Sequence, residues 1–82
     1  MSQFILFKGI DCAPCRTLEA FLNERGVGFA TVVGVDNPKE TVRRKVRTVP
    51  TLLLVDEEGE EIKRFVGLGQ LRELDEVIKE VC

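Results

Sequence analysis

The chain has 82 residues, of which 44% are hydrophobic and 32% are charged, a composition typical of one small globular domain rather than of a disordered segment. It carries 12 basic and 14 acidic residues, a formal net charge of −2, which argues against general binding to nucleic acids. It contains no histidine, which excludes Ser-His-Asp catalysis, Cys-His catalysis and every metal site built on imidazole.

The N-terminal residues and the cysteine count indicate the compartment. The apolar run at residues 4–7 is short and follows no basic segment, whereas a signal peptide needs a longer apolar stretch and a spanning helix needs roughly 20 apolar residues. Three cysteines are too few for a disulfide framework. We therefore expect a cytoplasmic monomer without a membrane segment, whose fold depends on its hydrophobic core.

The first half of the chain predicts a strand, a helix and a second strand. Residues 4–8 are almost wholly apolar, which suits a strand covered on both faces. Residues 9–14 have the composition of a loop, and from Cys15 apolar residues recur at helical spacing until Gly26 provides a stop signal. Residues 29–35 are rich in β-branched side chains and predict the second strand.

A short helix is predicted next. Asn37 and Pro38 supply an N-cap and a proline at the first helical position, and Glu40 occupies the capping-box position. We expect this helix to extend to about Val46 and to pack along a narrow apolar stripe formed by Val42 and Val46.

The remaining chain predicts a hairpin followed by a helix. Residues 51–55 form a continuous apolar run typical of a central strand, and the more polar residues 60–66 predict an edge strand after a turn. A glycine-containing break at 67–69 precedes an amphipathic helix from Leu71 to the C-terminus. Residues 1–82 therefore predict a single α/β domain of order β-α-β-α-β-β-α, with the sheet between helix layers.

Two cysteines, three positions apart, carry the chemistry. Cys12 lies between the first predicted strand and helix, where unsatisfied N–H groups and the positive end of the helix dipole stabilise a thiolate. Cys15 lies in the first helical turn, close enough to form a disulfide with Cys12 and more shielded. This asymmetry predicts that Cys12 attacks a substrate disulfide and that Cys15 resolves the mixed disulfide. Ala13 and Pro14, between them, are candidate substrate contacts, and Pro14 suits the opening of a helix.

The segment Arg47-Thr48-Val49-Pro50-Thr51 is the second signal. Together with the C-x-x-C after the first strand and with the final hairpin and helix, it resembles the thioredoxin/glutaredoxin superfamily over nearly the whole chain. The resemblance implies a minimal thioredoxin fold with a four-stranded mixed sheet and three helices. It also implies a cis Val49–Pro50 bond beside the disulfide, and a Val49 backbone that pairs with an extended substrate segment. A trans proline at the first residue of a strand is the alternative that the sequence allows.

The activity that the resemblance implies is thiol-disulfide oxidoreduction, serving electron transport and cell redox homeostasis. The Cys12–Cys15 pair is itself the redox centre, and no motif demands a bound cofactor or a metal. The implied partners are a disulfide-bearing protein substrate and an electron donor, either an upstream reductase or a low-molecular-weight thiol.

The sequence departs from both branches of the superfamily. Residues 67–71 stand where glutaredoxins carry a Gly-Gly and Asp motif that holds the γ-glutamyl end of glutathione. Asp11 and Leu6 stand where thioredoxins carry a Trp and a buried Asp. The sequence therefore leaves the electron donor open.

Charged residues near the two motifs are candidate modulators. A negative charge at Asp11, next to Cys12, should oppose thiolate formation, and Lys8 can offset it or support the thiolate. A plain loop residue at Asp11 and a solvated lysine at the end of the strand are the alternatives. A basic strip leads into residues 48–51, which we call the proline segment. The strip consists of Lys39, Arg43, Arg44, Lys45 and Arg47. Arg47 is the favoured contact for an acidic partner or a carboxylate-bearing thiol, and a solvated helix face is the alternative.

A C-x-x-C also has other uses. A zinc site needs four ligands, and only Cys82 remains as a further thiol, so a carboxylate or a second chain in a metal-bridged dimer would have to complete it. Two buried inert cysteines, or a redox-inactive module that docks a partner at the Pro50 edge, are further alternatives. Cys82 has no partner by spacing and is interpreted as an incidental thiol.

Overall fold

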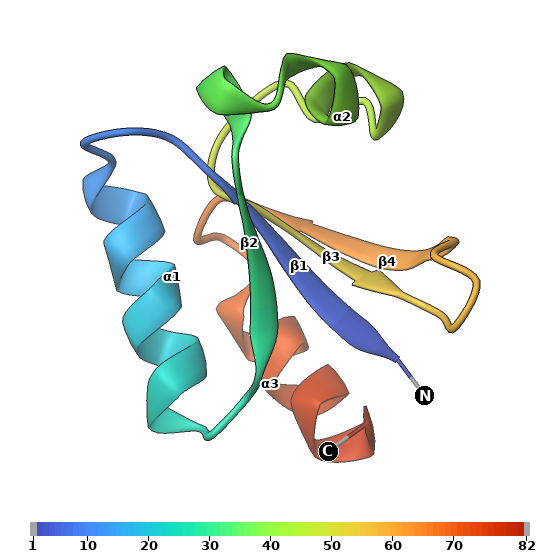
Figure 1. Ribbon diagram of the computed structural model, residues 1–82. Helices are drawn as coiled ribbons and strands as arrows, with labels where there is room; N and C mark the ends of the chain where they lie inside the picture. The colour runs from blue at the N-terminus through green and yellow to red at the C-terminus, as the bar shows by residue number, and fades with distance from the viewer. Residues whose placement is uncertain (1, 82) are drawn as a thin grey trace.

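The computed structural model describes residues 2–81, in which strands and helices alternate as predicted (Figure 1). The elements are β1 (Gln3–Lys8), α1 (Ala13–Glu24), β2 (Phe29–Val33), the 3-10 turn η1 (Gly34–Asp36), α2 (Pro38–Arg43), β3 (Thr51–Val55), β4 (Glu61–Val66) and α3 (Leu71–Val81). Within residues 2–81, the predicted order β-α-β-α-β-β-α is confirmed, and no helix is long and apolar enough to cross a membrane. Cys82 lies outside the described residues.

The strands form a mixed sheet in the order β2-β1-β3-β4. β1 is parallel to β2 and antiparallel to β3, and β3 is antiparallel to β4, with α1 as the crossover between the two parallel strands. The register places Lys8 opposite Val33 and Phe7 opposite Thr51. The last residues of β1 and β2 and the first residue of β3 therefore meet at one end of the sheet, where the site lies.

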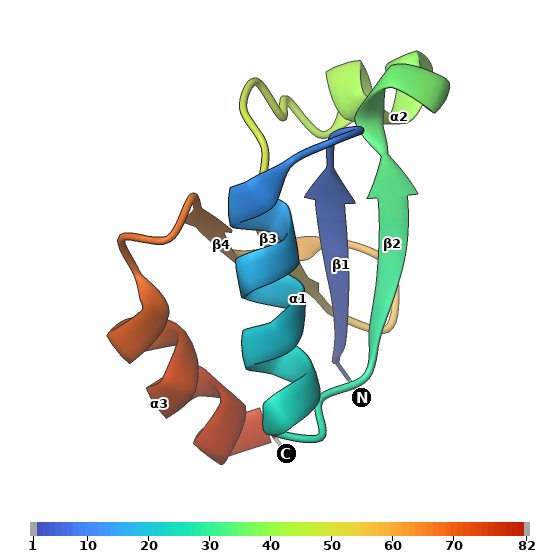
Figure 2. The same cartoon turned by 90° about the vertical axis from the view of Figure 1, so that its left-hand side faces the viewer.

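Two hydrophobic clusters cover the two faces of the sheet. Because side chains alternate along β1, Phe4 and Leu6 pack beneath α1 and α3 whereas Phe7 packs on the opposite face (Figure 2). The larger cluster contains Phe4, Leu6, Leu18, Leu22, Val27, Leu52, Leu54, Phe65, Leu74 and Ile78. The smaller cluster contains Phe7, Val46, Leu53 and Val55. β1 is thus covered on both faces, as its apolar composition predicts.

The second strand is shorter than predicted. β2 ends at Val33 instead of residue 35, because Gly34–Asp36 turns into a 3-10 helix and Asn37 Nδ2 donates a hydrogen bond to the Val33 carbonyl (2.9 Å). Since the Asn37 side chain is engaged there, it makes no cap hydrogen bond to α2, and the predicted capping box is wrong.

The second helix also differs from the prediction. α2 ends at Arg43, because Lys45 adopts a left-handed conformation (φ 57°) and the Val46 N–H bonds back to the Thr41 carbonyl (3.0 Å). Val42 is 76% exposed, and Val46 is buried only after the helix has ended. The predicted stripe of Val42 and Val46 is therefore wrong, and α2 itself contributes no buried side chain.

Candidate active site

The C-x-x-C forms a disulfide at the start of α1. Cys12 is bonded to Cys15, and their Cα atoms are 5.2 Å apart. Cys12 is the N-cap residue of α1, and its sulfur accepts a hydrogen bond from the Cys15 N–H (3.2 Å). The partial positive charge of the helix N-terminus therefore lies at Cys12 Sγ, where it favours a thiolate once the disulfide is reduced.

The two sulfurs differ in accessibility. Cys12 is half-buried, whereas Cys15 is only 1% exposed. Ala13 and Pro14 are exposed on the first turn of the helix between them. A substrate that approaches this turn can therefore reach Cys12 but not Cys15.

Asp11 precedes Cys12 in a left-handed conformation (φ 55°), and its side chain is exposed. Asp tolerates this conformation better than most residues, because its short polar side chain can bond locally. The first turn of α1 contains no acidic residue, so Asp11 is the carboxylate nearest to Cys12 in the sequence. That its negative charge opposes a Cys12 thiolate stays a prediction.

The predicted cis Val49–Pro50 bond is confirmed. Pro50 is buried, and its carbonyl accepts a hydrogen bond from the Gly67 N–H (2.8 Å). Thr51 Oγ1 donates to the Thr48 carbonyl (2.7 Å). These bonds attach the proline segment to the end of β4 and to the start of β3, while Val49 stays 41% exposed.

Gly9 allows the proline segment to approach the cysteines. A Cβ atom at Gly9 would lie 3.2 Å from Val49 Cγ2, which is tighter than ordinary van der Waals contact, and 3.9 Å from Cys12 Cβ. Val49 and Cys12 therefore both lie close to Gly9, and the lack of a side chain there leaves room for Val49.

Some cations of the basic strip form ion pairs, whereas others make no ion pair or side-chain hydrogen bond among the described residues. Arg43 and Arg44 bind Glu40 at 2.6 and 3.1 Å, and Arg44 also donates to the Gly59 carbonyl (2.7 Å). The hydrogen bond from Arg43 is the largest cause of a pKa of Glu40 below its usual 4.5. The members that make no ion pair or side-chain hydrogen bond within residues 2–81 are Lys39, Lys45 and Arg47.

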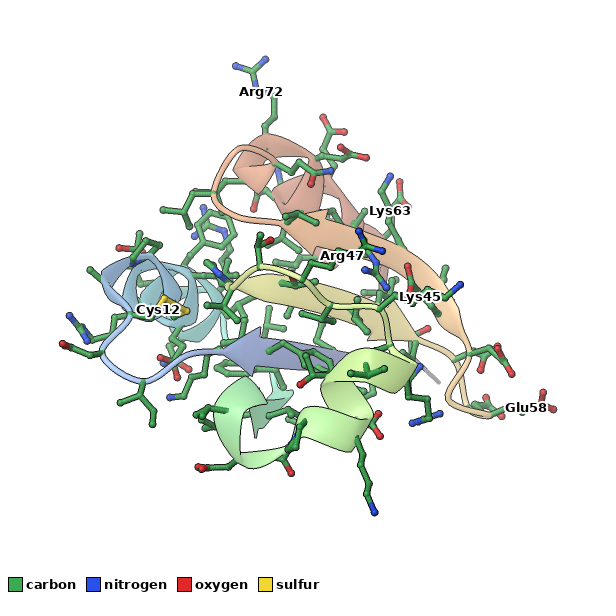
Figure 3. All side chains as sticks on the ribbon, turned by 90° about the horizontal axis from the view of Figure 1, so that it is seen from above. Cys12, Lys45, Arg47, Glu58, Lys63 and Arg72 are labelled. Atoms are coloured by element: carbon green, nitrogen blue, oxygen red, sulfur yellow. A yellow bond between two sulfur atoms is a disulfide. The ribbon has the colours of Figure 1, made fainter. Side chains whose placement is uncertain are left out.

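Among the free cations of the basic strip, Arg47 lies directly before the proline segment. It lines a cavity of about 260 Å³ together with Lys8, Gly9 and Val49. Figure 3 shows Lys45 and Arg47 near each other on the connection between α2 and β3, and Cys12 at the start of α1. The structure thus brings Arg47 to the proline segment but leaves the rest of the strip away from the cysteines.

A second cavity, of about 340 Å³, adjoins the disulfide and is lined by both cysteines and by Lys8, Asp11 and Glu19 among others. Lys8 Nζ lies 3.2 Å from Glu19 Oε2. Sequence analysis missed Glu19, although its position four residues after Cys15 places the two on one face of the helix. Across residues 2–81, no three or more Cys, Asp or Glu side chains come together as a metal site.

No family model matches the chain. The SPbeta prophage-derived thioredoxin-like protein YosR of Bacillus subtilis (strain 168) is 35% identical over 71 residues, which are 87% of this chain and 88% of that protein. The solved thioredoxin NaTrxh from Nicotiana alata superposes with a TM-score of 0.82 and 25% identity, covering 96% of this chain and 71% of its own. The Fasciola hepatica thioredoxin gives a TM-score of 0.74 and 28% identity, covering 96% of this chain and 79% of its own. These likenesses confirm the expected minimal thioredoxin fold.

Proposed function

Because the chain belongs to the thioredoxin/glutaredoxin superfamily, we propose that it is a thiol-disulfide oxidoreductase with Cys12 and Cys15 as its redox centre. The observation that carries the proposal is the Cys12–Cys15 disulfide at the N-terminus of α1, next to the cis-Pro50 segment. An accessible sulfur beside a shielded one is the arrangement that a two-step disulfide exchange requires.

The reaction begins with the reduced pair. The Cys12 thiolate attacks one sulfur of a substrate disulfide, and the second substrate sulfur leaves with the bonding electrons and takes up a proton. The Cys15 sulfur then attacks Cys12, closes the intramolecular disulfide and releases the first substrate sulfur. The helix N-terminus and the Cys15 N–H stabilise the negative charge on Cys12 before the attack.

The proline segment supplies the substrate contact. The Val49 N–H and C=O make no backbone hydrogen bond within residues 2–81, so they are available to an extended segment of a protein substrate. Ala13 and Pro14, exposed on the first turn of α1, complete this contact surface. Arg47, exposed and unpaired among the described residues, is the contact for a carboxylate of the substrate or of a thiol donor such as glutathione.

The cellular setting follows from the same chemistry. The protein works as a monomer in a reducing cytoplasm, where an upstream reductase or a low-molecular-weight thiol returns the Cys12–Cys15 disulfide to the dithiol. The number of cysteines supports this setting, since only three occur in the chain.

Reduction of insulin disulfides, with dithiothreitol as the electron source, tests the proposal. We expect the wild type to accelerate reduction, Cys12→Ser to abolish the acceleration and Cys15→Ser to accumulate a mixed disulfide with the substrate. Cys82→Ser is the matched control and should keep the wild-type rate. A wild type no faster than dithiothreitol alone, or a Cys12→Ser variant as active as the wild type, contradicts the proposal.

A further inference from the structure

The cavity beside the disulfide has charged walls that the exchange reaction described above does not use. Its charged groups come from three parts of the chain: Lys8 from β1, Asp11 from the loop, and Arg16 and Glu19 from α1. β2 contributes only Val33, which carries no charge. Asp11 and Arg16 are exposed, so Lys8 and Glu19 are the more shielded charges around the cysteines.

Lys8 and Glu19 form an ion pair close to Cys15. Their charged atoms are 3.2 Å apart, and their side chains are 29% and 25% exposed, so solvent screens the pair only in part. Cys15 and Glu19 are four residues apart on α1, which places their Cβ atoms about 5–6 Å from each other. The Lys8 ammonium is therefore held by Glu19 at the wall of the cavity that Cys15 also lines.

Cys15 receives less support for a negative charge than Cys12 does. The N–H group at the helix start is directed at Cys12, and Cys15 is 1% exposed, so water cannot solvate a thiolate there. The Cys15 sulfur must nevertheless lose its proton before it can attack Cys12. A nearby cation is the remaining means of stabilising that thiolate.

We propose that Lys8 changes its partner with the redox state, binding Glu19 while the disulfide is closed and the Cys15 thiolate when the mixed disulfide is resolved. This inference rests on the proposed function. Neither sulfur is charged in the disulfide, so Glu19 is then the carboxylate that holds the Lys8 ammonium. Lysine suits the exchange because its ammonium is a point charge on a flexible side chain.

Resolution of the mixed disulfide is one thiol-disulfide exchange. The Cys15 thiol gives its proton to solvent, and the thiolate, paired with Lys8, attacks Cys12 Sγ. The Cys12–Cys15 bond forms as the bond between Cys12 and the substrate sulfur breaks. The substrate sulfur leaves with the bonding electron pair and takes up a proton, and Lys8 returns to Glu19.

Substitution of Lys8 and substitution of Glu19 should shift the pKa of the Cys15 thiol in opposite directions. Lys8→Met removes the cation, so the pKa of the Cys15 thiol should rise by about one unit. Glu19→Gln removes the carboxylate that competes for Lys8, so the pKa of the same thiol should fall. An ion pair that only joins α1 to β1 has no reason to produce shifts of opposite sign.

The experiment is a pH titration of the Cys15 thiolate by its ultraviolet absorbance, in a Cys12→Ser/Cys82→Ser background that leaves Cys15 as the single thiol. Lys8→Met and Glu19→Gln are added separately, and Lys8→Arg should restore the value of the background. The matched control is Asp75→Asn, which breaks the similarly exposed Arg25–Asp75 pair near the other end of α1 and should shift nothing. In proteins with both active-site cysteines, resolution of the mixed disulfide at neutral pH should slow about three- to tenfold with Lys8→Met.

Shifts of the same sign for Lys8→Met and Glu19→Gln, or no shift in either, overturn the inference even if the wild type reduces insulin. An inactive wild type overturns the proposed function instead, because the thiolate titration needs no turnover. The two failures are thus distinguishable.

Discussion

The helices on the two faces of the sheet are attached by different forces. α1 and α3 bury Leu18, Leu22, Leu74 and Ile78 in the larger hydrophobic cluster. α2 buries no side chain, and the connection that follows it contributes Val46 alone to the smaller cluster. Apolar burial therefore holds α1, the helix that carries the cysteines, whereas polar contacts must hold α2 against the rest of the protein.

Arginine side chains hold α2. Arg44 and Lys45 directly follow the last residue of α2. Arg64 on β4 donates hydrogen bonds to their carbonyls, at 2.6 Å to Arg44 and 3.1 Å to Lys45. Arg44 in turn donates to the Gly59 carbonyl in the β3–β4 turn (2.7 Å). The proline segment follows this junction directly, so charged hydrogen bonds hold the end of the segment nearest α2, in addition to the bonds of Pro50 and Thr51 at its other end. The position of Cys12 depends on apolar packing of α1.

The largest effect should come from the apolar face. Leu22→Ala removes a fully buried side chain, and we expect it to lower the free energy of unfolding by about 3 kcal/mol, since the site can collapse only partly around the cavity. Urea denaturation measures the change. Val42→Ala, on exposed α2, is the control and should change stability by less than about 0.5 kcal/mol. Equal losses in the two variants would contradict the comparison of the faces.

A smaller loss should come from the arginine junction. Arg64→Met keeps much of the side-chain volume but removes both bonds to the end of α2, and we expect a loss of about 1–2 kcal/mol. The effect on insulin reduction should exceed that of Leu22→Ala under conditions where both variants are folded, because the proline segment loses its attachment on the side of α2. A variant with full activity and full stability would show that Arg64 does not hold this junction.

The sequence predicts best those elements that depend on local patterns. β3 was predicted with its observed bounds, because the apolar run at 51–55 is continuous and a proline and a turn flank it. The C-x-x-C and the proline segment were both identified, although their proximity came from the resemblance and not from the pattern. Both lie close to Gly9, and this proximity brings together residues that are distant in the sequence.

What the sequence does not predict depends on contacts between distant residues. Arg64 and its partners at the end of α2 are 19 and 20 residues apart, and no local pattern connects them. The end of α2 was missed because Lys45 occupies a left-handed position that glycine would have signalled. Glu19 was missed because its role depends on Lys8, on another element, although its spacing from Cys15 was visible.

The C-terminal ends of α1 and α2 allow a third test, with a smaller expected change in the free energy of unfolding. α1 and α2 end with the same pair of backbone hydrogen bonds, but the left-handed residue is Gly26 in α1 (φ 68°) and Lys45 in α2 (φ 57°). Lys45→Gly should therefore raise the free energy of unfolding by about 0.5–1 kcal/mol, because glycine adopts this conformation without steric cost. Thermal unfolding measures it, with Gly26→Ala as the reciprocal variant that should destabilise. A loss of stability in Lys45→Gly would mean that the lysine side chain contributes a contact.

The smallest expected effect separates the ion pair of Arg64 from its bonds to α2. The side-chain hydrogen bond from Arg64 is the largest cause of a pKa of Glu61 below its usual 4.5. A lowered folded-state pKa stabilises the fold above the unfolded value, and this contribution is lost as the pH falls through the folded value. Glu61→Gln should therefore be less stable than the wild type at pH 7 by a few tenths of a kcal/mol, since Arg64 and Glu61 are 28% and 35% exposed and solvent screens the pair in part.

The difference between wild type and Glu61→Gln should disappear in acid, where the wild-type carboxyl is itself protonated, while Arg64 keeps its bonds to the α2 carbonyls. Urea denaturation at a series of pH values measures this convergence. Glu58→Gln is the control, because Glu58 lies at the tip of the β3–β4 turn and points away from the body of the protein (Figure 3). If the gap between wild type and Glu61→Gln stayed constant at every pH, the glutamate would act through packing, and the attachment of α2 would depend on charge less than the comparison of the two faces implies.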